Sequence, residues 1–543
     1  MSAVAALDPP ERDSPDRWRW RAAWPAGLLG VLVLAGYAWS APHDGDFWWY
    51  DSARHAMNSI FIHDFFAQGG WRDPIAFARA YYAQYPGINI GFYPPFLYLA
   101  TAPVLGIFGV SHAVCQAVVA AFAAALAVGG YAVARPVIGR AGAFALGLML
   151  VLVPEVALWG RQVQLDVPAL SLLVWGAWAL ARFLEAPRTR WLVLGAVLLG
   201  CAMLTRVQTV FAWPLWLAVV FVHPVGRAQP WRGRLAATGL YGLLALPAVA
   251  SVLYFSSVVG SLAGKMPDMP PLVSWWNWGW YAARFPEQLG AAGLALLLLG
   301  LAAWLLRAPS QWLAAVRGRA GLMLAMALLA WGFFSIVSNK EPRFGLPILP
   351  FAMLAAGLVL GRWSTAGGMA KASMPMPVPV PMAVPALAAL MLVEAAVSGR
   401  WSDVPRLTGH REAAQAAARL APRDARVLIS AHRDGNFIVA MRADTARPDL
   451  AVRRADKLLV EMTIMRQLGI RDRGLDEPAI RALLDRERVD VVVSQTGYLG
   501  DQPSMQALQR LLDSDCCFVL RETIPITGRH RPDERELRVY ARR

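Results

Sequence analysis

The sequence predicts an α-helical, polytopic membrane protein that carries a C-terminal extracytoplasmic α/β domain. The first indication is composition: 57% of the 543 residues are hydrophobic and only 16% are charged, which is typical of a chain that lies largely in a bilayer. The second is a series of apolar runs of membrane-spanning length. The third is a change near residue 401, after which charges rise and strand-like patterns alternate with helix-like ones. We therefore divide the chain into a cytoplasmic N-terminus (1–22), a transmembrane domain (23–400) with a first outer loop at 41–111, and a soluble domain (401–543).

The apolar runs predict about 11 spans. The first run follows a basic segment and resembles a signal sequence, but many further spans follow it, so we interpret it as an uncleaved signal anchor. The runs lie at residues 22–39, 112–134, 141–158, 167–185, 191–205, 207–223, 236–259, 288–307, 320–338, 344–361 and 378–397.

Basic residues between the runs predict the orientation of the chain. They collect in alternate loops, at Arg135 and Arg140, Arg182 to Arg190, Arg227 to Arg234, Arg307 to Arg319, and Arg362 to Lys371. The positive-inside rule places these loops in the cytoplasm. The other loops and the C-terminal domain then face outward, as in a multi-pass protein of the cell inner membrane. Much of the net charge of +15 is explained in this way, and we expect no nucleic acid partner.

Two segments need a separate interpretation. Residues 94–110 are apolar enough to span, yet a full crossing there would invert every later loop, so we interpret them as re-entrant or interfacial. Residues 364–385 contain the run MPMPVPVPMAVP, whose prolines predict an extended linker before the last span.

The C-terminal region has the pattern of a small α/β domain. Five strand-like segments read ARVLIS, FIVAM, VDVVVS, CFVLRE and LRVYA, and helical patterns lie near 411–420, 456–468, 477–487 and 504–513. The first strand is followed by AHRDGN rather than by a glycine-rich phosphate fingerprint. We therefore expect a scaffold or an acceptor-facing domain here, and no nucleotide site.

The first outer loop holds the residues most suggestive of chemistry. It carries five Asp and no Glu between residues 42 and 95, next to the aromatic cluster Trp48-Trp49-Tyr50. Asp51, Arg54 and His55 are three and four positions apart, so they share one face if Asp51 begins a helix. An Asp at this position also caps a helix and suits its dipole without any function. The presence of an acid, a base and a histidine together at the rim of a membrane domain favours a catalytic site.

Other outward loops contribute further candidates. They are Tyr93 in the YPP segment, Arg161 and Asp166 in GRQVQLDVP, Arg206 in LTRVQ, and Lys340 and Arg343 in SNKEPRFGLPILP. Each basic residue alone could simply extend to lipid headgroups. Several cations that converge with carboxylates suit another purpose: the cations would hold a lipid-linked phosphate, and a carboxylate would take a proton from an acceptor hydroxyl.

The order of these motifs resembles that of the C-type glycosyltransferases of family 39, whose relatives include the protein O-mannosyltransferases and the lipid A aminoarabinose transferases. The resemblance covers about residues 20–400, and its most specific part is the K-x-P-R-F-x-L-P-x-L-P motif, which this chain carries as KEPRFGLPILP. It implies the C-type glycosyltransferase fold and a polyprenyl-phosphate-linked sugar as donor at the outer face. The acceptor would be a lipid, a glycan or a protein.

The resemblance also implies roles for individual residues. Asp51 matches the catalytic acid of the first loop and Asp166 that of the second, while Arg206 and Arg343, with Lys340 beside them, match the donor-phosphate region. Arg54, His55, Tyr93 and Arg161 remain further site candidates. Where the family has Asp-Glu, this chain has Asp51-Ser52, which leaves acceptor choice and the exact base open. We expect no cofactor other than, at most, a divalent metal at the outer acids.

A transporter or flippase of a lipid-linked saccharide is the alternative interpretation. Charges within the spans would mark its pathway, but the spans hold few ionisable residues, of which Glu394 is one. Inverted repeats, which are usual in transporters, are not apparent. The collection of charges at one face favours surface chemistry.

Overall fold

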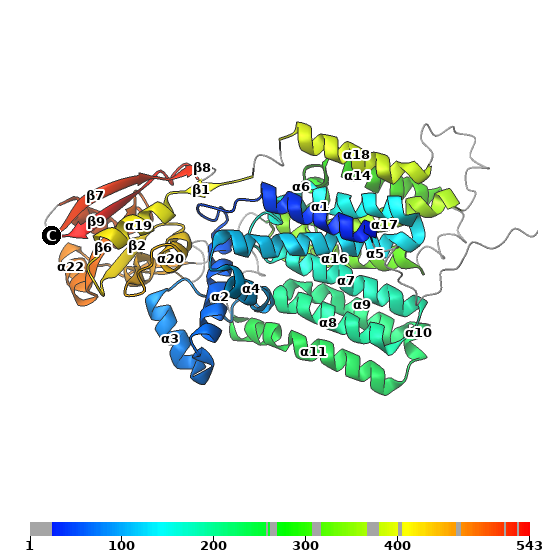
Figure 1. The fold of residues 1–543 in the computed structure, drawn as a ribbon, viewed down its shortest axis with the longest axis horizontal. Coiled ribbons are helices and arrows are strands. Elements are labelled where there is room, and N and C mark those ends of the chain that lie inside the picture. The colour runs from blue at the N-terminus through cyan, green and yellow to red at the C-terminus, as the bar shows by residue number, and fades with distance from the viewer. Residues whose placement is uncertain are drawn as a thin grey trace, which may run out of the picture.

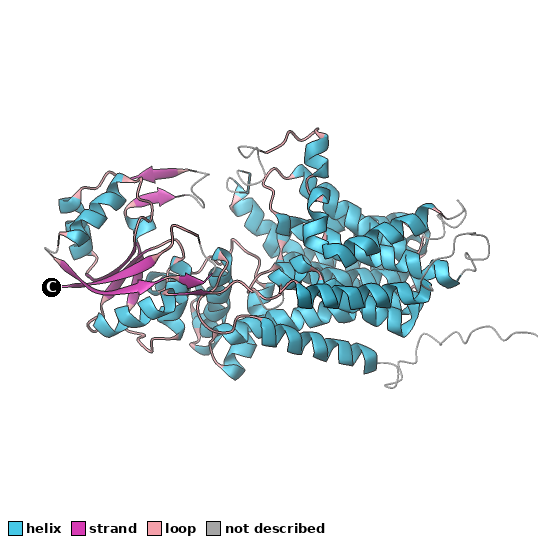
Figure 2. Cartoon of the chain, turned by 90° about the horizontal axis from the view of Figure 1, so that it is seen from above, coloured by secondary structure: helices cyan, strands magenta, loops and turns pink. Residues whose placement is uncertain are grey.

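The computed structural model describes residues 24–256, 259–260, 269–306, 317–365, 380–399, 404–462, 469–514, 517–528 and 531–543. The chain forms a helical bundle at one end and a mixed α/β domain at the other, with helices α2, α3 and α4 between them (Figure 1). Strands are confined to the end that holds the C-terminus (Figure 2). The predicted fold class is therefore confirmed.

The bundle is built from the predicted apolar runs. Its helices are α1 (Trp24–Ser40), α5 (His112–Leu152), α6 (Pro154–Trp159), α7 (Asp166–Glu185), α8 (Thr189–Thr205), α9 (Trp213–Leu217), α10 (Pro224–Arg227), α11 (Trp231–Tyr254), α13 (Trp275–Gly279), α14 (Phe285–Leu305), α16 (Arg319–Ile336), α17 (Ile348–Thr365) and α18 (Val380–Val397). Short helices η3 (Val207–Ala212), η4 (Ala218–Val222), η5 (Ala282–Arg284) and η6 (Pro342–Gly345) join them. By length and composition, six helical segments among the described residues could cross a membrane, and several shorter apolar helices accompany them.

Helix α5 combines two of the predicted spans. Its 41 residues contain Gly139, whose φ of 71° interrupts the helix. This left-handed conformation suits glycine because a Cβ would be strained there. The two predicted runs at 112–134 and 141–158 thus meet at this break, while α6 takes the end of the second.

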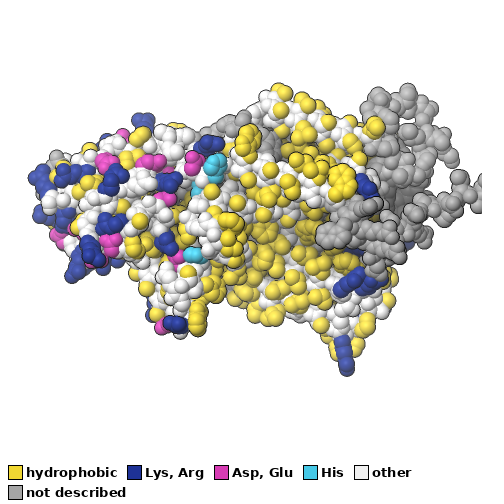
Figure 3. All heavy atoms as spheres, in the orientation of Figure 1, with side chains coloured by type: hydrophobic (Ala, Val, Ile, Leu, Met, Phe, Trp, Pro, Cys, Tyr) yellow, Lys and Arg dark blue, Asp and Glu magenta, His cyan; other side chains and the backbone are white. Residues whose placement is uncertain are grey.

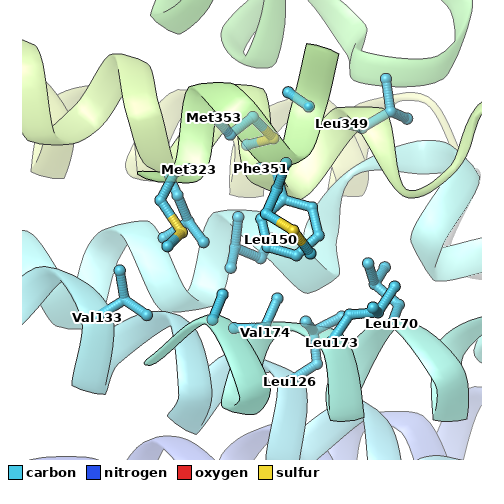
Figure 4. Packing of buried hydrophobic residues seen from close by; sticks show 14 of the residues in the cluster. Leu126, Val133, Leu150, Leu170, Leu173, Val174, Met323, Leu349, Phe351 and Met353 are labelled. Carbon is cyan, nitrogen blue, oxygen red and sulfur yellow. The ribbon is translucent and has the colours of Figure 1, made fainter. Parts of the chain in front are cut away.

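Large apolar side chains fill the centre of the bundle. Leu150 from α5, Leu173 from α7, Met323 from α16 and Phe351 from α17 meet there (Figure 4). Apolar side chains also dominate the visible face of the bundle, whereas charged groups gather on the C-terminal domain (Figure 3). An apolar exterior of this kind is what a bilayer requires.

Three helices lie between the bundle and the C-terminal domain. They are α2 (Tyr50–Ala67), α3 (Pro74–Gln84) and α4 (Phe96–Phe108), with the single turn η2 (Gly70–Arg72) before α3. The 13 residues of α4 extend over about 20 Å at 1.5 Å per residue, which is less than the thickness of a hydrocarbon core. The interfacial interpretation of residues 94–110 agrees with this length and stays a prediction.

The C-terminal domain contains a five-stranded mixed sheet in the order β3-β2-β6-β9-β7. Strand β2 (Arg426–Ser430) pairs in parallel with β3 (Ala451–Arg454) and β6 (Val489–Gln495), and β9 (Glu536–Arg542) pairs antiparallel with β6 and β7 (Phe518–Pro525). Two small sheets pair β1 (Leu407–Thr408) with β8 (Thr527–Gly528) and β4 (Val460–Met462) with β5 (Ile470–Asp472).

Helices cover both faces of the sheet. Val491 and Val493 of β6 pack in the cluster of α19 (His410–Leu420) and α20 (Asp434–Ala443), whereas Val492 packs with α22 (Glu477–Arg486) and α23 (Pro503–Asp513). Such alternation follows from the two-residue period of a strand. The cluster with α19 and α20 also includes Met57 of α2, so it continues into the loop region 41–111.

Two predicted elements of this domain need correction, and one strand was missed. The segment FIVAM was expected to be a strand but lies within helix α20, and the strand β3 at Ala451–Arg454 was missed. A short apolar run cannot be assigned to strand or helix by periodicity alone. The helix expected at 456–468 is reduced to α21 (Ala455–Leu458), followed by strand β4. The rest of that segment, most of the proline-rich linker at 364–385 and the N-terminal residues 1–22 lie outside the described residues.

Candidate active site

Asp51 lies in the first turn of α2, where the helix dipole favours a negative charge. Its side chain is 30% exposed, and its Oδ2 is 3.5 Å from Nη2 of Arg343. Capping of the orphan amides is the usual role for an acid in this place. The N-cap position of α2 is Trp49, however, and no side chain caps the helix there. The carboxylate of Asp51 is therefore paired with a guanidinium that comes from a distant part of the sequence.

Arg343 projects from η6 between two carboxylates and aromatic rings. Its Nε lies 2.6 Å from Oε2 of Glu341. Its guanidinium carbon is 5.0 Å from the ring centroid of Trp49 and 5.5 Å from that of Trp159. A guanidinium packs well on aromatic faces, which fixes its plane while leaving N–H groups available. Arg343 is therefore held in place by Glu341 and by the aromatic rings that pack on the flat faces of its guanidinium.

A second ion pair joins Asp166, the first residue of α7, to Arg206, which follows the last residue of α8. The side chain of Asp166 is only 3% exposed and that of Arg206 12%. The guanidinium carbons of Arg206 and Arg343 both lie 5.5 Å from the ring of Phe344. Burial, and then the positive charge of Arg343, lower the pKa of Arg206. Two neighbouring guanidinium groups that repel each other are suited to hold an anion between them.

His55 and Tyr93 border the same region. The Nδ1 of His55 is 2.8 Å from the hydroxyl of Tyr98, and its ring centroid is 4.8 Å from that of Tyr93. Burial lowers the pKa of His55 to about 4, although the charge of Asp51 acts in the opposite direction. Burial, reinforced by Asp51, raises the pKa of Tyr93 well above its usual value. Both side chains are consequently neutral near pH 7.

Three predicted site residues are engaged elsewhere. Lys340 donates to the carbonyl oxygens of Phe334, Ser335 and Val337 at 2.8–3.1 Å, and so caps the end of α16. Arg54 forms an ion pair of 2.8 Å with Asp434 of the C-terminal domain.

Arg161 is buried and donates from Nε to the carbonyl oxygen of Ala157 at 2.9 Å. The structure thus brings together six of the nine candidates, namely Asp51, Asp166, Arg206, Arg343, His55 and Tyr93.

Several residues of the region were not singled out from the sequence. Glu341 and the rings of Trp49 and Trp159 hold Arg343, and the KEPRF motif and the tryptophan cluster were the available signals. Ser52, which stands where the family has Glu, is fully buried, and its hydroxyl accepts from Nε2 of Gln164 at 2.8 Å. The side chain at position 52 therefore links the first loop to the loop before α7.

A cavity of about 690 Å³ lies beside α6, and none of the six gathered residues lines it. Its lining includes Leu158, Arg161 and Glu155, together with residues of α14 and α18. Oε1 of Glu155, which lines the cavity, accepts from Nε1 of Trp159 at 2.8 Å, and Trp159 in turn packs on Arg343. A cavity of this size can hold several sugar rings or a lipid headgroup.

The acids of the site do not form a cation cage within the part of the chain that the structure describes. No group of three or more His, Cys, Asp or Glu side chains gathers there in a way that could hold a metal ion. Asp51 and Asp166 each face an arginine instead.

Comparisons with known proteins agree with this architecture. Residues 93–255 match the family model described as dolichyl-phosphate-mannose-protein mannosyltransferase, and residues 277–401 match that of the Alg9-like mannosyltransferase family. The first segment contains Asp166 and Arg206, and the second contains Arg343. A search of curated protein sequences finds no match.

Solved structures extend the comparison over nearly the whole chain. The chain is similar to ArnT from Cupriavidus metallidurans in the apo state, with a TM-score of 0.60, 13% identity, and coverage of 96% of this chain and 98% of the other. For ArnT from the same organism bound to undecaprenyl phosphate, the TM-score is 0.55, the identity 15%, and the coverage again 96% and 98%.

The helical bundle and the C-terminal α/β domain together define the class of this protein. It is a polytopic membrane protein with a C-terminal soluble domain. Within that class, two segments of the chain match mannosyltransferase family models, and the chain shares the C-type glycosyltransferase fold with ArnT. The resemblance predicted from its sequence motifs is confirmed.

Proposed function

We propose that the protein transfers a sugar from a polyprenyl-phosphate donor to an acceptor hydroxyl on the extracytoplasmic side of the membrane. The observation that carries this proposal is the meeting of Asp51 with Arg343, 3.5 Å apart, beside a second guanidinium at Arg206. A carboxylate that can accept a proton thus faces a pair of cations that can hold a phosphate.

The roles follow from the chemistry of glycosyl transfer. The acceptor oxygen attacks the anomeric carbon of the donor and forms the new glycosidic bond. The bond from that carbon to the phosphate oxygen breaks, and its electron pair goes to the leaving polyprenyl phosphate. The acceptor proton goes to Asp51, and Arg343 and Arg206 stabilise the negative charge that grows on the phosphate.

The remaining residues of the region would shape the site. Asp166 holds Arg206 in place through the buried ion pair. His55 and Tyr93, both neutral, would offer hydrogen bonds to sugar hydroxyls without competing for the acceptor proton. Because Lys340 already donates to three carbonyl oxygens, we do not include it among the phosphate ligands.

Polyprenyl phosphate as the donor carrier is supported by two findings. One solved relative in fold, ArnT, is described as bound to undecaprenyl phosphate, and one matching family model is described by a dolichyl-phosphate sugar. The apolar bundle beside the arginines would receive the polyprenyl chain.

A donor comparison tests the proposal. Purified protein in lipid vesicles would be given either a panel of polyprenyl-phosphate hexoses and pentoses or the matching nucleotide sugars, with a membrane extract as the source of acceptor. We expect release of polyprenyl phosphate together with sugar incorporation from the lipid donors only. Transfer from a nucleotide sugar, or equal activity of the Asp51→Asn protein, would contradict the proposal.

A further inference from the structure

We infer that Arg433, a residue of the C-terminal domain, is a positioning residue that holds the start of helix α2 so that Asp51 faces Arg343. The inference rests on the proposed function, because it concerns the geometry of the proposed base. It gives the soluble domain a part in the reaction, although this domain supplies none of the six gathered site residues.

Arg433 and Glu534 form an ion pair that is almost completely removed from solvent. The Nε of Arg433 is 2.8 Å from Oε2 of Glu534, and the side chains are 5% and 0% exposed. A buried charge pair is a weak source of net stability, but each partner strongly restricts the position of the other. The guanidinium therefore has a fixed location relative to the sheet of the C-terminal domain.

The remaining surface of Arg433 contacts the residues that begin α2. Its Nη1 donates to the carbonyl oxygen of Trp48, and its guanidinium carbon is 4.3 Å from the ring centroid of Tyr50. The hydroxyl of Tyr50 donates to Oε1 of Glu534 at 3.2 Å. The Arg433–Glu534 pair thus contacts Tyr50, which directly precedes Asp51, and Trp48, which lies two positions before Tyr50.

Helix α2 has no side-chain cap of its own at this end. Its N-cap residue is Trp49, which makes no capping hydrogen bond through its side chain. Trp49 instead packs edge-on against Trp159 at 5.1 Å and lies 5.0 Å from the guanidinium carbon of Arg343. A continuous set of contacts therefore runs from Glu534 through Arg433 and the residues around Trp49 to Arg343.

An ion pair between the C-terminal domain and a later turn of α2 provides a matched comparison. Arg442 of the C-terminal domain binds Asp64 near the other end of α2, with N–O distances of 2.7 and 2.8 Å. Asp64 is 13 residues after Asp51, or about 20 Å along a helix. Arg433 and Arg442 both dock the C-terminal domain on α2, but Arg433 contacts Trp48 and Tyr50 beside Asp51, whereas Arg442 contacts Asp64 far from it.

The test compares Arg433→Lys with Arg442→Lys in the full-length protein. Each variant keeps a positive charge for its acidic partner and loses the flat, multiply bonded guanidinium. Turnover of the polyprenyl-phosphate sugar that the wild-type protein uses fastest would be measured together with backbone hydrogen exchange at residues 50–55. Tyr50→Phe, which removes only one hydroxyl from a partly exposed side chain, serves if Arg433→Lys does not fold.

We expect Arg433→Lys to lower kcat by about 10- to 100-fold, the cost of a misplacement of about 1 Å, while KM for the donor changes less than about 2-fold. Hydrogen exchange at residues 50–55 should accelerate in Arg433→Lys and Tyr50→Phe, and not in Arg442→Lys. Equal effects of the two lysine variants, or unchanged exchange in Arg433→Lys, would overturn the inference. If the proposed function alone is wrong, the exchange result still holds while Asp51→Asn keeps its activity.

Discussion

The two ion pairs of the site differ in a way that separates support from chemistry. Asp166 and Arg206 form a close pair, and the acid is 3% exposed. Asp51 and Arg343 are 3.5 Å apart, and the acid is 30% exposed. A close, buried pair has little freedom to exchange partners, whereas a loose and partly exposed pair can open to admit a substrate between its members. We therefore call Asp166–Arg206 the closed pair and Asp51–Arg343 the open pair.

The surroundings of the two pairs strengthen this contrast. Arg343 of the open pair is held by aromatic faces and Glu341, so it does not depend on Asp51 for its position. Arg206 of the closed pair lies just before η3, and Asp166 is its ionic partner. An Asp–Arg pair can thus serve either for support or for chemistry. The exposure of the acid and the distance between the two charged groups distinguish these purposes.

Removing the negative charge of Asp51 from the open pair should have the largest effect on turnover. Asp51→Asn keeps the shape of the side chain and removes the group that accepts the proton. Transfer should fall by about 10²- to 10⁴-fold, as is typical of a lost general base, while the melting temperature stays within a few degrees. Initial rates and thermal unfolding of the purified variant check this, and near-normal transfer would refute the role of Asp51.

Breaking the closed pair should reduce stability instead. Asp166→Asn leaves the guanidinium of Arg206 buried beside Arg343 without its carboxylate, which for a buried pair costs about 3–5 kcal/mol. The midpoint of thermal unfolding in detergent should fall clearly, whereas Asp51→Asn serves as the matched control with one carboxylate removed in the same way. Equal stability of the two variants would remove the distinction between the pairs.

Substitution of Arg343 should act on the donor. Arg343→Ala removes a guanidinium from the developing charge of the leaving phosphate, so turnover should fall by about 10²- to 10³-fold. Arg343→Lys should recover only part of this loss, because a lysine cannot bind a phosphate in a bidentate manner. If Arg343 merely contacted lipid headgroups, turnover of both variants would remain normal in the donor assay.

The smallest effect concerns pH. The pKa of His55 is about 4 in the folded protein and 6.5 in a model compound, so the unfolded chain binds a proton that the folded chain does not take up between these values. Stability should consequently fall on acidification from pH 6.5, by about 2 kcal/mol at pH 5. A His55→Gln protein should lose this part of the pH dependence. An unchanged slope of unfolding free energy against pH between 6.5 and 5 would contradict a buried, neutral His55.

Features that depend on the local order of residues could be predicted from the sequence. Features that depend on contacts between distant parts of the chain could not. Apolar runs of spanning length sufficed for the fold class, and the KEPRFGLPILP motif singled out Arg343, whose role stays a prediction. The partner of Arg54 could not be predicted, because Asp434 lies 380 positions away. Lys340 was misleading for a related reason: its charge looked available in the sequence, yet the end of α16 uses all three of its hydrogen bonds.

Short segments of the soluble domain show the same limit. The residues FIVAM of α20 are as apolar as a buried strand because the helix is covered on one side by the sheet and on the other by α2. Gly435 of α20 has so little space that a Cβ there would lie 3.1 Å from the Cβ of Ala53. Only the docking of α20 against the first outer loop explains this composition, and no local pattern encodes that contact.

The central claim is that the two members of the open pair act on different substrates, and the binding of polyprenyl phosphate tests it most directly. Equilibrium binding of undecaprenyl phosphate would be measured for the wild-type, Asp51→Asn and Arg343→Ala proteins. We expect Asp51→Asn to bind this ligand at least as tightly as the wild type, because a competing carboxylate is gone, although its turnover is lost. Arg343→Ala should bind it at least about 10-fold more weakly. Weakened binding in Asp51→Asn, or unchanged binding in Arg343→Ala, would contradict the account.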